Sequence, residues 1–350
     1  MGVRVAVALS GGVDSAVAAF LLLQRGCEVV GVTFTTPYTQ NCRCVADHLR
    51  IPLVELDFSA LFERMVREYF LREYLRGRTP NPCVVCNEVL KFGAFLKEAL
   101  RRTAAQFYAT GHYVRILRAA EHRCLVLKGR DAEHDQSYFL VLTNAQVYER
   151  VLFPLGEMSK ADVRTVAREA RLPVDVERSS RDVCFAPAGY RSLFAANPRV
   201  RGGDIVDWKG RVVGRHDGLV HYTVGQRKGL RLRLGYPVYV QRLDVEQNRV
   251  IVAPRRLLYA RSVLVHPVNF VGFERPKAPL RVRARCRYRQ QDVPAVLLPQ
   301  PASFREAPEG AAELRFEEAV FAPAVGQFAA FYCGDVLLGG GTVHSVLFPS

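Results

Sequence analysis

Six residues near the N-terminus have the types and spacing needed to bind phosphate. They read Ser10-Gly11-Gly12-Val13-Asp14-Ser15. Adjacent glycines let backbone amides converge without Cβ obstruction, and the serine hydroxyls add further donors. Where such a turn opens a helix, its free N–H groups and the positive end of the helix dipole also attract an anion. A Walker A loop would need a Lys before its last Ser/Thr, and none is present. We therefore predict a different nucleotide-phosphate cradle.

Three of the nine cysteines stand where thiol chemistry is favoured. Cys83 and Cys86 form a Cys-x-x-Cys pair in a loop that two prolines make rigid. Cys184 lies far away in the sequence, in a polar stretch typical of an exposed loop. We expect a helix to begin near Asn87, which would place Cys86 at a helix N-terminus beside cationic side chains. Both features lower the pKa of a thiol, so we expect Cys86 to be a thiolate.

A parallel sheet must position these groups. The apolar run 3–9 predicts a buried strand and 16–23 predicts a helix, with the glycine turn between them. Further strands are expected at 28–34, 52–56, 106–109 and 125–127, and helices at 44–49, 62–75 and 160–170. This alternation is typical of a doubly wound α/β domain, in which ligands bind beyond the carboxyl ends of the strands.

The second half of the chain has shorter periods. Residues 203–255 contain brief β-like runs and a basic turn at 225–230, which suggests a small linking domain. From residue 263 to 347, alternating runs predict an antiparallel β-barrel or sandwich. Five alternating arginines at 281–289 would share one strand face, either solvated or turned toward RNA. We place the domain boundaries at 1–195, 196–262 and 263–350.

Composition limits the partners. A chain of 350 residues with 49% hydrophobic and 24% charged residues is typical of folded domains. No apolar run is long enough to span a membrane, and the start of the chain lacks a leader pattern, so we expect a cytoplasmic protein. The net charge of +15 indicates a polyanionic partner such as nucleic acid, or else a generally arginine-rich surface.

Several segments occur in the order of one known family. They are Ser10–Ser15, Thr79–Asn87 with Lys91-Phe92, Ala109–Tyr113, Asp135–Leu140, Pro154–Gly156, Asp182–Phe185, His216–Gly218, Tyr222–Leu230, Arg287–Gln290 and Pro323–Gly340. Over nearly the whole chain the sequence resembles the tRNA-specific 2-thiouridylases of the ATP pyrophosphatase superfamily. Those enzymes replace the C2 oxygen of the wobble uridine with sulfur. The resemblance implies an adenine nucleotide alpha hydrolase-like PP-loop domain, a central linking domain and a C-terminal β-barrel that binds tRNA.

The resemblance also implies a mechanism and its participants. ATP, with Mg²⁺ across its phosphates and Asp14 near the metal, would adenylate C2; Cys184 would carry a persulfide, and Cys86 would release the product and leave a Cys86–Cys184 disulfide. A cysteine desulfurase or relay protein would supply sulfur to a monomeric enzyme. The implied ATP-binding residues are Ala8, Leu9, Ser10, Gly11, Gly12, Val13, Asp14, Ser15, Phe34 and Gly111. Those implied for tRNA and its target base are Asn81, Pro82, Cys83, His112, His134, Asp135, Gln136, Arg287, Tyr288 and Gln327.

Departures from the family pattern leave alternatives open. Cys83 stands where the family has Asp, so Cys83, Cys86 and Cys184 could instead hold a [4Fe–4S] cluster, as in related RNA thiolases. His134 stands where a Lys usually precedes Asp135. The segment 35–44 is shorter than usual, and its two cysteines have no assigned role. Rival functions are a PP-loop ligase or amidotransferase acting on a small metabolite, and a non-enzymatic RNA-binding protein.

Overall fold

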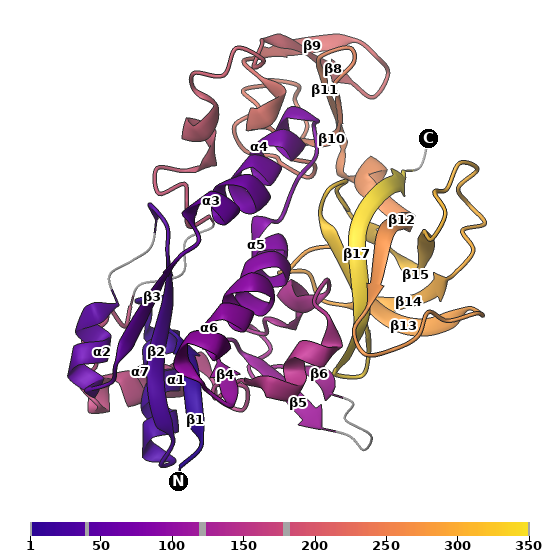
Figure 1. The fold of residues 1–350 in the computed structure, drawn as a ribbon. Coiled ribbons are helices and arrows are strands. Elements are labelled where there is room, and N and C mark those ends of the chain that lie inside the picture. The colour runs from indigo at the N-terminus through magenta and orange to yellow at the C-terminus, as the bar shows by residue number, and fades with distance from the viewer. Residues whose placement is uncertain (1, 39–41, 119–123, 178–182, 349–350) are drawn as a thin grey trace. The chain divides into compact units, whose positions relative to one another are not determined.

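The computed structural model describes residues 2–38, 42–118, 124–177 and 183–348 (Figure 1). The chain divides into two compact units. Unit 1 comprises Met1–Val66, Cys83–Phe185 and Asp335–Leu337, and unit 2 comprises Arg67–Pro82, Ala186–Gly334 and Leu338–Ser350. Within the described ranges, no helix combines the length and the apolar character that crossing a bilayer requires.

Unit 1 is built on a five-stranded parallel sheet. Its strand order is β3-β2-β1-β4-β7, and the strands are β1 (Arg4–Ala8), β2 (Glu28–Thr35), β3 (Leu53–Asp57), β4 (Phe107–Ala109) and β7 (Val151–Leu152). Along the chain, β2 and β3 are added to the sheet on one side of β1, and β4 is then added on the other side. The crevice between the carboxyl ends of β1 and β4 is therefore the topological switch point, where ligands of such sheets bind. The predicted α/β class is confirmed.

Helices cover both faces of this sheet. The helices α1 (Val13–Gln24) and α7 (Lys160–Glu169) share one buried cluster with the β1 side chains Val5 and Val7. The helix α6 (Phe95–Thr103) contacts β1, β2, β3 and β4, and α2 (Arg43–Leu49) follows β2. The buried apolar stripe on α1 explains this arrangement, because a strand and a helix must each bury an apolar face. A hairpin of β5 (Val114–Arg118) and β6 (Cys124–Lys128) follows β4.

The helix around the Cys-x-x-Cys pair begins earlier than expected. Helix α5 covers Pro82–Cys86 and continues through a π-helical segment, Asn87–Ala94, into α6. Proline suits the first turn of a helix, because its fixed φ is helical and its missing N–H would be unpaired there. The prediction of a start near Asn87 was wrong, and Cys86 lies at the end of α5 rather than at a helix N-terminus. The amphipathic stretch 62–75 is helical as predicted, from α3 (Ser59–Phe62) through a π-helical turn to α4 (Glu68–Leu75).

Unit 2 contains a small sheet and a barrel. The sheet has the order β10-β11-β8-β9, from β8 (Gly203–Asp207), β9 (Val212–His216), β10 (Val238–Asp244) and β11 (Arg249–Pro254). The barrel is antiparallel and closes where β12 pairs with both β15 and β17. Its strands are β12 (Tyr259–Phe270), β13 (Leu280–Arg285), β14 (Val293–Leu298), β15 (Ala312–Phe321), β16 (Phe328–Cys333) and β17 (Val336–Leu347). The predicted barrel is confirmed.

The predicted five-arginine strand face is wrong. Strand β13 ends at Arg285, whose buried guanidinium donates a 2.9 Å hydrogen bond to the hydroxyl of Tyr332. A turn follows, in which the backbone N–H of buried Cys286 donates to Gln290 Oε1 at 3.1 Å. The alternation therefore stops before Arg287, since the turn no longer projects successive side chains to opposite faces.

Candidate nucleotide and thiol site

The loop Ser10–Ser15 connects β1 to α1 at the switch point. Gly11 has a φ of +78°, which favours glycine, and α1 begins at Val13. The Ser15 hydroxyl donates to the carbonyl of Gly12 at 2.9 Å and accepts from the backbone N–H of Ser10 at 3.1 Å. These bonds hold the loop in a fixed curve. The first N–H groups of α1 have no partner within the helix, so the loop is preorganised for an anion.

A lysine that the sequence analysis did not identify neutralises this loop. Lys160 Nζ lies 2.5 Å from Asp14 Oδ1, and both side chains are mostly buried. The hydroxyl of Tyr113 donates to the same carboxylate oxygen at 2.7 Å. Burial and the neighbouring Asp14 carboxylate raise the pKa of Tyr113, so the phenol stays protonated and continues to donate. The arrangement places a cation beside a phosphate cradle that lacks a lysine of its own.

The N-terminus of α7 fixes that lysine. Ser159 forms a reciprocal capping box with Asp162, and the backbone N–H of Lys160 donates to Asp131 Oδ2 at 2.8 Å. His134 lies 3.0 Å from the same Asp131 oxygen. Burial alone would raise the pKa of Asp131, but the hydrogen bonds from Lys160 and His134 outweigh it and lower that pKa. His134 thus supports the loop before α7.

Gly111 brings the end of β4 against the phosphate loop. A Cβ at this position would lie 2.6 Å from the backbone carbonyl carbon of Asp14 and 2.8 Å from the amide nitrogen of Ser15. No side chain fits at that distance. The absence of a side chain at Gly111 is therefore explained by packing on the loop. Its contact with a nucleotide remains a prediction, as do the contacts of Ala8, Leu9 and Phe34; the last packs edge-on against Phe95 at 5.1 Å between ring centroids.

The three thiols gather in unit 1. Cys86 is buried, whereas Cys83 and Cys184 retain solvent exposure. Desolvation raises the pKa of Cys83 and Cys86, Lys91 lowers the pKa of all three thiols, and Cys184 is near enough to raise the pKa of the other two slightly further. Lys91 belongs to the π-helical segment that follows Cys86. Its wide turn, of more than four residues, brings position 91 back toward the face of position 86.

Burial reverses the expected acidity of Cys86. Desolvation raises the pKa of this thiol to about 12, and Lys91 offsets only part of the rise. Desolvation by the surrounding atoms also raises the pKa of the Cys184 thiol, although the residue as a whole is exposed. The prediction of a thiolate at a helix N-terminus was wrong, because the helix begins at Pro82 and encloses the side chain. At neutral pH Cys86 is a protonated thiol.

Aromatic packing positions the Cys184 loop. The neighbouring Phe185 is 2% exposed, and its ring lies 5.8 Å from that of Phe62 and 6.1 Å from that of Tyr38. Because this packing anchors Phe185, the exposed sulfur of the adjacent Cys184 is held near the Cys-x-x-Cys helix. Asp182 of the family motif, and residues 39–41 of the shortened segment, lie outside the described residues.

The donor sets fit ATP better than a metal. Asp14, expected near Mg²⁺, is already paired with an ammonium group, so this carboxylate does not fit a metal ligand. Among the residues that the structure describes, no three His, Cys, Asp or Glu side chains are grouped as a metal ion would require. The arrangement of Cys83, Cys86 and Cys184 therefore does not favour the [4Fe–4S] alternative. The open loop amides and Lys160 suit a polyphosphate.

Most residues implied for tRNA contact in unit 1 have structural partners. His112 is buried, its Nδ1 lies 2.8 Å from Thr110 Oγ1, and burial followed by Lys91 holds its pKa well below the usual value. Buried Asp135 accepts hydrogen bonds from the N–H of Gly129 and from Ser137, both at 3.0 Å. Gln136 Oε1 accepts from the N–H of Tyr113 at 3.0 Å. Direct contact of these side chains with RNA remains a prediction.

Two of the implied tRNA residues of unit 2 hydrogen-bond to backbone carbonyls of distant segments. Arg287 donates to the carbonyls of Val224 and Ala322 at 2.8 and 2.6 Å. Gln327 donates to the carbonyl of Thr79 at 2.9 Å and so holds the loop that leads to Asn81 and Pro82. Tyr288 is half-buried in the turn after β13. The spacing of residues in the sequence could not predict these hydrogen bonds, because each joins segments far apart in the chain.

Comparison with known proteins matches the chain to three family models. They are described as tRNA methyl transferase HUP domain (residues 3–188), tRNA methyl transferase PRC-barrel domain (195–254) and aminomethyltransferase beta-barrel domain (260–343). Proteins named tRNA-specific 2-thiouridylase MnmA are similar over almost their full length. The one from Moorella thermoacetica is 41% identical over 97% of this chain and 99% of its own, and the one from Treponema denticola is 39% identical over 98% of each.

A more distant likeness exists among solved structures. A 4-thiouridine synthetase–RNA complex with bound ATP is 22% identical over 48% of this chain and 40% of its own, with a TM-score of 0.32. That likeness is too remote to inform the site.

Proposed function

The chain belongs to the family of tRNA-specific 2-thiouridylases, and we propose that it uses ATP to convert the wobble uridine of tRNA to 2-thiouridine. The observation that carries the proposal is the presence, in one unit, of a preorganised phosphate loop and a cluster of Cys86 and Cys184. A small-metabolite ligase would need the loop alone. An RNA-binding protein without activity would need neither.

The first step activates the base. The C2 oxygen of uracil attacks the α-phosphorus of ATP, the bond to the bridging oxygen breaks, and pyrophosphate leaves. The amides of Gly11–Asp14 hold the departing pyrophosphate, since a helix N-terminus stabilises anions. Lys160 stays paired with Asp14 and places its positive charge beside the phosphates, while Tyr113 keeps the Asp14 carboxylate in place. The O-adenylated base then carries AMP as a leaving group.

The second step delivers sulfur. A persulfide on Cys184 attacks the activated C2 through its terminal sulfur, and AMP departs with the former C2 oxygen. Cys86 then gives up its proton and attacks the Cys184 sulfur, which breaks the S–S bond and frees the 2-thiouridine. The enzyme is left with a Cys86–Cys184 disulfide, which an external dithiol reduces with two electrons. Lys91 favours the transient Cys86 thiolate by its charge.

Finer assignments complete the proposal. We assign residues 1–195 to catalysis and residues 196–262 and 263–350 to tRNA binding. Since its substrate is tRNA, we further propose that the enzyme is cytoplasmic. We also propose that it is a monomer and that a cysteine desulfurase or relay protein loads Cys184 with sulfur. The exposure of Cys184 supports loading by another protein.

The test is thiolation in vitro with cysteine variants. Purified protein is incubated with tRNA, ATP and a persulfide donor, and the tRNA nucleosides are quantified by mass spectrometry. We expect Cys184→Ser to give no 2-thiouridine and Cys86→Ser to trap tRNA covalently on Cys184. Cys333→Ser, which removes an exposed thiol of unit 2, is the matched control and stays active. Undiminished 2-thiouridine with Cys184→Ser would exclude the proposal.

A further inference from the structure

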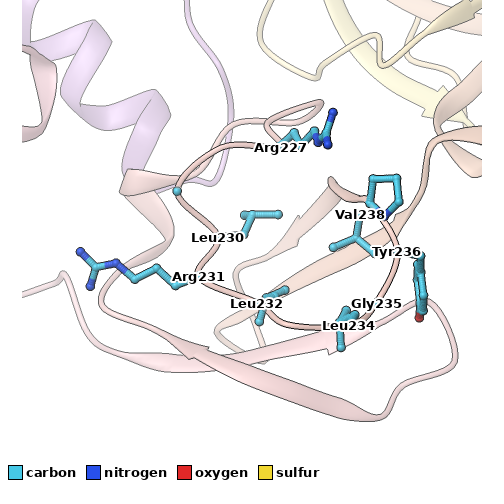
Figure 2. Close-up of a pocket in the computed structure, with 10 residues that line it drawn as sticks. Arg227, Leu230, Arg231, Leu232, Leu234, Gly235, Tyr236 and Val238 are labelled. Atoms are coloured by element: carbon cyan, nitrogen blue, oxygen red, sulfur yellow. The ribbon is translucent and has the colours of Figure 1, made fainter.

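The loop before β10 encloses a pocket on the small sheet of unit 2. It runs from Arg227 to Val238, and the pocket is wide open to solvent, with a volume of about 390 Å³ (Figure 2). Leu230 and Val238 are buried in the core of this sheet, and Leu232 and Leu234 pack against the same core. Leucines therefore alternate with arginines along the loop, and because the leucines pack on the core of the sheet, the exposed lining of the pocket is mostly polar. A volume of this size suits a small organic group such as a nucleotide.

The rim of the pocket is strongly basic. The loop carries Arg227, Lys228, Arg231 and Arg233 and has no Asp or Glu. All four side chains are exposed, and none of them takes part in the ion pairs found among the described residues. In Figure 2, Arg227 and Arg231 project outward from the loop, away from its leucines. Unpaired cations gathered around a pocket favour an anionic ligand.

An aromatic pair borders the same pocket. Tyr236 lines the pocket and is 44% exposed, although large aromatic side chains are mostly buried. Its ring meets that of Trp208 at an angle of 74° and a centroid distance of 6.2 Å. Lys209 Nζ lies 5.8 Å from the Trp208 ring. Edge-on packing against Trp208 holds Tyr236 in place and leaves a ring face for stacking.

We propose that this pocket binds one unstacked nucleotide of the tRNA, with the base against Tyr236 and the phosphate beside Arg227. The inference rests on the proposed function and adds a second RNA contact, separate from the target uridine. An RNA is favoured over an acidic protein because stacking on an aromatic ring and unpaired arginines are the features that bind single-stranded bases.

The experiment measures tRNA affinity of the full chain by filter binding at several salt concentrations. Loss of one base–aromatic stack predicts that Tyr236→Ala raises the Kd for tRNA about 5- to 150-fold, whereas Tyr236→Phe, which keeps the ring, binds like the original protein. Arg227→Ala should reduce the slope of log K against log salt by about 0.7 to 1. Val212→Ala, at a 60% exposed position on β9, is the control for removing an exposed apolar side chain from the same sheet. Ultraviolet cross-linking of bound tRNA should mark a peptide within residues 226–238.

Each alternative outcome is distinct. Equal tRNA affinity of Tyr236→Ala and Tyr236→Phe overturns the pocket while leaving thiolation by the original protein intact. Unchanged tRNA affinity of Arg227→Ala and Tyr236→Ala, with slower thiolation from a protein donor but not from a small-molecule persulfide, would make the surface a docking site for an acidic protein. Failure of the original protein to thiolate tRNA would instead defeat the proposed function.

Discussion

Replacing Lys160 by Met tests the role of the ammonium group beside the phosphate loop. Lys160 is 14% exposed and its partner Asp14 26%, so this ion pair lies between a surface pair and a buried one. Surface pairs contribute at most about 1 kcal/mol, and removing one partner of a buried pair costs about 3–5 kcal/mol. The hydroxyl of Tyr113 continues to stabilise Asp14. We therefore expect Lys160→Met to lower the free energy of unfolding by about 2 kcal/mol.

The effect on ATP consumption should be larger than the effect on stability. Removing a single group that stabilises charge in a transition state lowers kcat by about 10²–10³. We expect that fall in pyrophosphate release with Lys160→Met at saturating tRNA, and a smaller fall with Lys160→Arg, which keeps the charge. Urea unfolding of each variant separates misfolding from loss of catalysis.

A double variant separates two roles of the lysine. Asp14→Asn with Lys160→Met removes both charges, and its unfolding free energy should recover toward that of the original protein. Pyrophosphate release should stay low, because the phosphates still lack their cation. If the double variant also regains its full rate, Lys160 merely neutralises Asp14, and the reasoning about phosphate binding is refuted.

Three further outcomes follow from single contacts. Gly111→Ala would push a methyl group to 2.6 Å from the Asp14 backbone, so pyrophosphate release should fall at least about tenfold; an unchanged rate would show that the loop can yield. The rate of alkylation of Cys86, followed by mass spectrometry, should be slow at pH 8. It should then rise about tenfold per pH unit up to the Cys86 pKa of about 12, and rapid labelling at pH 7 would contradict that pKa. Asp135→Asn removes part of the buried hydrogen bonding to Gly129 and Ser137. Urea unfolding should therefore show a free energy of unfolding lower by about 2–4 kcal/mol, and a decrease below about 0.5 kcal/mol would refute this.

The sequence was sufficient for the elements that local patterns determine. The apolar run before Ser10 and the glycine turn after it predicted β1, the loop and α1, because strand, turn and helix each depend on neighbouring residues. The contacts of Lys160 with Asp14 could not be predicted, since 146 residues separate them. Tertiary burial likewise decides the state of Cys86. The loop prediction assumed solvent around this thiol, whereas α5 begins at Pro82 and encloses it.

The high pKa of Cys86 has a chemical consequence in the proposed cycle. A thiolate next to the Cys184 persulfide would attack its inner sulfur at once, form the Cys86–Cys184 disulfide and lose the outer sulfur as sulfide. Burial keeps Cys86 protonated and so delays this reaction until the sulfur has been transferred to the base. Lys91 then stabilises the thiolate by a charge that is already in place. Removing this charge with Lys91→Gln should therefore slow product release more than sulfur transfer, and tRNA bound covalently to Cys184 should accumulate. Free 2-thiouridine formed at the original rate by that variant would show that Cys86 needs no cation.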